Sequence, residues 1–136
     1  MLDLAKKDPA KSAEVGFTFD LTLPDGEKTD AKITVRGTYS PEVKNFARKF
    51  VQEQKVKEQQ AKRRGKEVEE MTLDEAEDFS VDAAVVRIVS WKGIGEDGKE
   101  VPFNKENATR ILKKYPFIRE QIMDHSDNIF NFSFRE

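Results

Sequence analysis

Two stretches in the first half of the chain alternate between apolar and polar residues. The apolar positions of these stretches are Val15, Phe17, Phe19, Leu21 and Leu23, followed by Ala31, Ile33, Val35, Gly37 and Tyr39. A Pro-Asp-Gly turn at residues 24–26 separates them, because Pro presets φ and Gly accepts a positive φ. A period of two predicts a β-hairpin over residues 15–39 with one apolar face. Since an isolated hairpin is only marginally stable, we expect a helix or another subunit to cover that face.

After the hairpin, the spacing of apolar residues becomes helical. Ser40, Pro41 and Glu42 form a helix start, and an apolar stripe follows on Val43, Phe46, Ala47 and Phe50. Capping patterns at Thr72 and Asn104 open further helices. We predict helices near residues 41–64, 73–79, 81–91, 105–115 and 117–129. Residues 85–89 are β-branched enough to form a strand, but the periodicity and the caps favour a helix.

These elements predict an α+β fold in which the N-terminal β-hairpin packs on a mainly helical domain. A chain of 136 residues suffices for one domain with a modest core, so residues 15–136 form a single domain with a helical part at 41–130. Residues 1–14 are polar and Lys-rich, and we interpret them as a flexible arm in which Pro9 breaks any early helix. A groove between the hairpin and the helix starting at Pro41 is the predicted contact surface for a partner.

Composition changes this picture in three ways. The absence of Cys excludes disulfides and thiolate metal sites. The N-terminal residues have no apolar core of signal-peptide length, and no apolar stretch approaches the length that spans a bilayer, so we expect a soluble protein without membrane contact. A formal net charge of −2 gives no general attraction to nucleic acid.

The candidate chemical motifs all have simpler structural explanations. The segment 93–98 matches G-x-G-x-x-G, but Glu96 and Asp97 would repel phosphate, and no helix start follows directly. Five acids cluster at Asp74, Glu75, Glu77, Asp78 and Asp82, with the spacing of a helix N-terminus rather than of a calcium loop. His125 is the only histidine, and we expect it to be solvated among its acidic neighbours. We therefore predict no catalytic, cofactor-binding or metal-binding residues and no enzyme activity.

Apolar and basic surfaces are the better candidates for function. The segment 55–66 holds six Lys and Arg residues but no aromatic residues for stacking, and Glu residues surround it. It favours a solvated or partner-docking helix over a nucleic-acid interface. The alternating Phe130, Phe132 and Phe134 either close the core as an added strand or offer an edge to a partner. We take five residues as the candidate partner-binding set: Phe46, Phe50, Phe130, Phe132 and Phe134.

The run that starts at Trp91 has the parts of a compact joint between two helices. It resembles a segment of small tail assembly chaperones of long-tailed bacteriophages, which carry Trp-x-Gly, an Asp-Gly turn, and Pro-Phe-(Ser/Asn)-x-Glu-Asn before a Leu-rich helix. The matching residues are Trp91, Gly93, Asp97, Gly98, Pro102, Phe103, Asn104, Glu106, Asn107, Ile111 and Leu112. The likeness extends from Val85 to Ile122 and does not include the N-terminal half.

This resemblance implies a non-catalytic chaperone, of the short form, that acts in the host cytoplasm. Such proteins bind the tape measure protein, help recruit the major tail protein during tube assembly, and commonly form homo-oligomers. Two alternatives remain: a small nucleic-acid-associated regulator that uses residues 55–66, and another virion structural protein.

Overall fold

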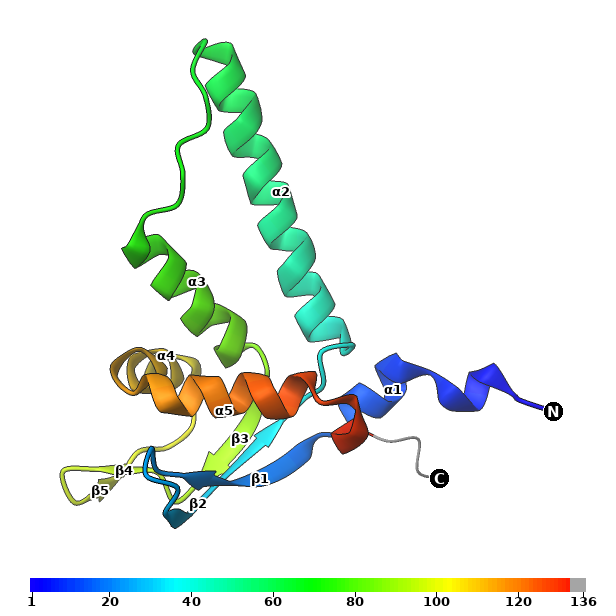
Figure 1. Cartoon of the computed structure of the whole chain (residues 1–136), viewed down its shortest axis with the longest axis vertical. Coiled ribbons are helices and arrows are strands. Elements are labelled where there is room, and N and C mark those ends of the chain that lie inside the picture. Colours follow the sequence, from blue (N-terminus) through cyan, green and yellow to red (C-terminus); the bar gives the residue numbers. More distant parts are fainter. Residues whose placement is uncertain (133–136) are drawn as a thin grey trace.

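A three-stranded antiparallel sheet of order β1-β2-β3 forms the base of the protein (Figure 1). The computed structural model describes residues 1–132. The strands of this sheet are β1 (Phe17–Thr22), β2 (Lys28–Val35) and β3 (Ile88–Lys92). The helices are η1 (Leu4–Lys7), α1 (Pro9–Glu14), α2 (Pro41–Arg63), α3 (Leu73–Val85), α4 (Lys105–Lys114), α5 (Pro116–Asp127) and η2 (Ile129–Phe132). The α+β class and the N-terminal hairpin are thus confirmed.

The apolar face of the hairpin is covered by a helix from the other end of the chain. Helix α5 packs on β1 and β2, and it also contacts α3 and α4. Ile33 of β2, Leu112 of α4 and Ile122 of α5 have no exposed surface and form the centre of the core. The hairpin, which could not be stable alone, therefore gains its stability from apolar area that α5 removes from water.

Strand β3 lies where the sequence predicts a helix. The two predicted helices 73–79 and 81–91 are replaced by one helix, α3, that ends at Val85, and the chain then forms β3 from Ile88. Trp91 pairs with Ile33 across β2 and β3. The prediction of a helix at 81–91 holds as far as Val85 and is wrong beyond it. The β-branched residues there fit the open edge of β2, a long-range pairing that local periodicity does not reveal.

Helix α1 corrects the prediction for the N-terminal segment. Pro9 does not break a helix but begins one, at the position where its missing N–H costs least. Asp8 caps this helix by accepting a hydrogen bond from Ala10 N at 2.9 Å. Ala13 is buried, and its carbonyl oxygen accepts a bond from Gly37 N at 2.9 Å. A Cβ atom at Gly37 would lie 2.8 Å from Ala13 Cβ, so only glycine permits this docking.

The joint that starts at Trp91 is compact, as predicted, but it connects strand β3 to helix α4. Trp91 Nε1 donates a hydrogen bond to the Val101 carbonyl oxygen at 2.8 Å, and its ring meets Phe103 edge-on. The small hairpin between them, β4 (Gly95–Glu96) and β5 (Lys99–Glu100), turns at Asp97 and Gly98, which both have positive φ. This is the Asp-Gly turn preferred in two-residue hairpins.

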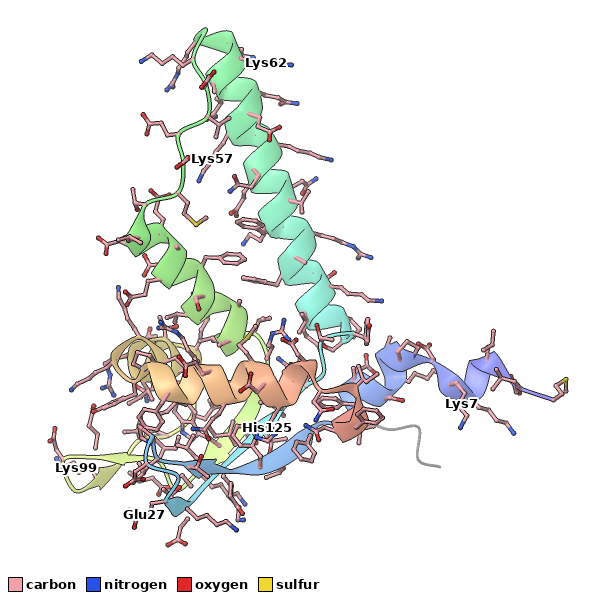
Figure 2. All side chains as sticks on the ribbon, viewed as in Figure 1. Lys7, Glu27, Lys57, Lys62, Lys99 and His125 are labelled. Carbon is pink, nitrogen blue, oxygen red and sulfur yellow. The ribbon has the colours of Figure 1, made fainter. Side chains whose placement is uncertain are left out.

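His125 lies between α5 and the sheet (Figure 2). Its ring stacks on Phe19 with the centroids 4.0 Å apart. The expectation of a solvated histidine was only partly right, because α5 turns this residue towards β1 and the side chain is partly buried. Burial lowers the pKa of His125 below its ordinary value, and the negative charge of Asp124 only partly opposes this effect.

We predict a pH dependence of stability that originates at His125. Because its pKa is lower in the folded state, the folded protein binds this proton less readily than the unfolded chain. The stabilising contribution is complete above the unfolded pKa of about 6.5 and is lost as the pH falls below that value. Denaturant unfolding at pH 7.5 and pH 5.5 should therefore show a smaller loss of stability for His125→Phe than for the wild type. Equal losses in the two proteins would contradict this assignment.

Candidate partner-binding groove

Helix α2 extends away from the sheet and leaves most of its surface free (Figure 1). Its 23 residues give a length of about 35 Å. Val43, close to its first turn, is the buried residue of this helix. The chain then returns through residues 64–72 to α3, which lies beside α2. A long helix with so little burial is unusual, because packing of an apolar face provides most of the stability of helices in proteins.

A groove of about 580 Å³ lies between α2 and α3. Phe46 and Phe50 extend from α2 and meet Phe79 of α3, with ring centroids 5.6 and 4.4 Å from it. These three rings are only partly buried. The complete lining is Phe46, Lys49, Phe50, Glu53, Phe79, Asp82, Val85, Val86, Phe103 and Lys105. The groove therefore has an apolar surface bordered by four charged side chains.

A second hollow, of about 300 Å³, lies further along α2 and is lined mostly by polar and charged residues. Lys57 comes from α2, Arg64 directly follows α2, and Glu75 comes from α3. The returning segment adds Lys66, Glu67, Val68, Glu69 and Glu70. Lys57, labelled in Figure 2, thus has acidic residues close by, whereas Lys62 does not line this hollow. Those carboxylates would repel a nucleic-acid phosphate at this surface.

A buried polar network fixes the base from which α2 and α3 extend. Ser126 Oγ donates a hydrogen bond to the Arg36 carbonyl oxygen at 2.7 Å and accepts one from Arg87 Nη1 at 3.0 Å. Arg87 also pairs with Asp127 at 2.7 Å. Arg36 Nε lies 3.8 Å from a carboxylate oxygen of Glu42, in the first turn of α2. The network therefore connects the sheet, the end of α3 and α5 to the start of α2.

The predicted partner-binding residues separate into two places. Phe46 and Phe50 lie together in the groove, whereas Phe130 and Phe132 line an apolar hollow of about 230 Å³ next to α1. Phe132 is buried as the core interpretation expected, but it lies in the short helix η2 rather than in an added strand. Phe130 is 82% exposed. Phe134 lies outside the described residues.

The apolar groove lies between α2 and α3 rather than between the hairpin and α2, and the surface that a partner contacts stays a prediction. The second wall of the groove is α3, and its central residue, Phe79, was missed by the sequence analysis. The spacing of Phe79 from Val86 places both on one face of a helix, which was the available signal. Which helix lies opposite that face depends on the path of the chain through residues 64–72, and no local sequence pattern predicts this path.

The glycine-rich segment 93–98 has no geometry for nucleotide binding. It forms the β4–β5 hairpin, and Glu96 is held on α4 by Arg110 Nη1 at 2.5 Å and by Tyr115 Oη at 3.0 Å. These hydrogen bonds, from Arg110 first, lower the pKa of Glu96. Within residues 1–132, no group of three His, Asp or Glu side chains is placed to hold a metal ion. In the same range, no helix combines the length and apolar character required to cross a membrane.

Comparison with known proteins identifies a family for most of this chain. The family model described as YdaY prophage protein matches residues 41–136, which is more than two thirds of the sequence. No curated protein and no solved structure matches the chain. The matched region begins at Pro41, the first residue of α2, and includes the whole groove. The chain therefore belongs to the YdaY prophage protein family and is a phage-derived protein.

Proposed function

We propose that this prophage protein is a non-catalytic tail assembly chaperone that binds the tape measure protein and helps tail tube assembly. The observation that supports the proposal is the phenylalanine groove between α2 and α3. It offers partly exposed rings from two helices, which is the surface that an apolar helix of a client requires. Each large apolar side chain that becomes fully buried contributes about 1.5–3 kcal/mol.

The border of the groove fits the same role. Lys49, Glu53, Asp82 and Lys105 surround the rings with charges of both signs. A charged border keeps the free protein and the complex soluble, while the apolar centre holds the client. Recruitment of the major tail protein, assembly into a homo-oligomer and action in the host cytoplasm belong to this proposal.

The test is co-expression with a tape measure protein from the same prophage. We expect the wild type to increase the soluble fraction of that protein. The double variant Phe46→Ser and Phe50→Ser should reduce the soluble fraction to the level seen without chaperone. The matched control is Val51→Ser with Val56→Ser, because these residues lie on the same helix and are 51% and 50% exposed. An unchanged soluble fraction with the wild type would contradict the proposed function.

A nucleic-acid-associated regulator is the second candidate, since the far half of α2 presents Lys57 and Lys62 away from the sheet. The carboxylates of the polar hollow oppose this function. DNA binding that weakens steeply with salt would favour it, because phosphate contacts release counterions. For a virion structural protein, the discriminating observation is presence in finished particles, which a chaperone leaves after assembly.

A further inference from the structure

We infer that the occupant of the groove is an amphipathic helix with segregated charges, acidic along the flank that faces α2 and basic along the flank that faces α3. This inference rests on the proposed function, because it specifies the kind of client segment that the groove binds. It goes further by stating the charge pattern that distinguishes this segment from other apolar helices.

The two walls carry opposite charge. Helix α2 contains seven Lys or Arg residues against three acidic residues, whereas α3 contains five acidic residues and no basic ones. The difference persists among the residues that line the two hollows. Lys49 and Lys57 with one acid, Glu53, come from α2, whereas Asp82 and Glu75 come from α3. Segment 64–72 adds two basic and three acidic residues to the polar hollow. An occupant between these walls therefore has a basic side and an acidic side to face.

The opposite walls do not neutralise each other by direct contact. The ion pairs within residues 1–132 include none between α2 and α3. Asp78 of α3 pairs with Lys113 of α4 instead, at 3.2 Å. Lys49 of α2 and Asp82 of α3, which both line the apolar groove, are thus available to an occupant. Complementary charges of this kind mainly determine specificity and register, while the apolar contacts supply affinity.

The length of the groove fits a helix of several turns. Its apolar part follows α2 from Phe46 to Glu53, about 11 Å, which matches apolar anchors at positions i, i+3 or i+4, and i+7 of a partner. The polar hollow lies further along the same helix and reaches Arg64, about 27 Å from Phe46 along the helix axis. A helix of about 18 residues covers this distance.

Two synthetic peptides of about 18 residues test the inference. Both have the same Leu stripe and the same numbers of Glu and Lys. One peptide has Glu on one flank and Lys on the other, and the second has both residue types interleaved on both flanks. A peptide helix can bind in the groove in either direction, and reversing the direction exchanges its two flanks. The two peptides therefore differ only in whether Glu and Lys are on separate flanks, and not in which flank is acidic. We expect fluorescence anisotropy to show about tenfold tighter binding of the segregated peptide at low salt, and no difference at high salt.

A pair of variants locates the effect. Asp82→Asn with Glu75→Gln should remove most of the preference, and Gln at position 75 keeps the side-chain type that completes the cap at Thr72. Glu27→Gln with Glu100→Gln is the matched control, because both residues are exposed and lie outside the two hollows. The control should retain the full preference.

The possible outcomes separate this inference from the proposed function. Equal binding of the two peptides overturns the charge pattern, even if co-expression still solubilises the tape-measure-like protein. If neither peptide binds, and Phe46→Ser with Phe50→Ser converts an oligomer into a monomer in sedimentation, a second copy occupies the groove and the inference is also overturned. Failure of co-expression contradicts the proposed function itself.

Discussion

Trp91→Ala is expected to lower the free energy of unfolding by about 3–5 kcal/mol, as for other buried aromatic residues that are cut back to Ala. Trp91 is only 7% exposed, and it connects three parts of the structure. Its backbone pairs with Ile33 of β2, its ring packs against Phe103, and its indole N–H bonds to Val101. Removal of the side chain leaves a cavity between the sheet and the start of α4.

The measurement is denaturant unfolding followed by far-ultraviolet circular dichroism, because Trp91 is the only tryptophan and the variant loses that fluorescence signal. The variant Trp91→Phe separates the contribution of the apolar contact from that of the indole hydrogen bond. It keeps most of the apolar contact but leaves the buried Val101 carbonyl without its donor, which costs about 1–3 kcal/mol. A loss below about 1 kcal/mol for Trp91→Ala would show that this side chain does not hold the joint together.

The elements that sequence reasoning located correctly have strong local signals. Alternation and the Pro-Asp-Gly turn located the hairpin, and Ser40 with Pro41 marked the first residue of α2. Asn104 caps α4 as expected by accepting a hydrogen bond from Asn107 N at 2.8 Å. In each case a few neighbouring residues determine the backbone conformation, so tertiary contacts need only agree with it.

The errors arose where distant parts of the chain decide the structure. Strand β3 forms because β2 offers it an edge, and helix α1 is docked because Gly37 allows close approach. The candidate site shows the same division. Phe46 and Phe50 could be recognised from their helical spacing, but their neighbour Phe79 arrives from α3. The hydrogen bond between Arg87 and Ser126 joins residues 39 positions apart, and no sequence motif predicts it.

The second large effect is expected at the groove itself and appears as a covalent product. A photo-reactive benzoylphenylalanine at position 50 places its reactive carbonyl beside Phe79, where a client helix would lie. The substitution is conservative because the native residue is also a phenylalanine that is only partly buried. The same group at position 51 is the control, since Val51 is 51% exposed and lines neither hollow.

Irradiation of cells that co-express the tape-measure-like protein is the most direct test of the central claim, that the space between α2 and α3 holds a client polypeptide. We predict a cross-linked product with that protein from position 50 and none from position 51. Mass spectrometry of the product should identify an apolar helical segment of the client. Cross-linking from position 51 alone, or from neither position while the client remains soluble, would contradict the claim.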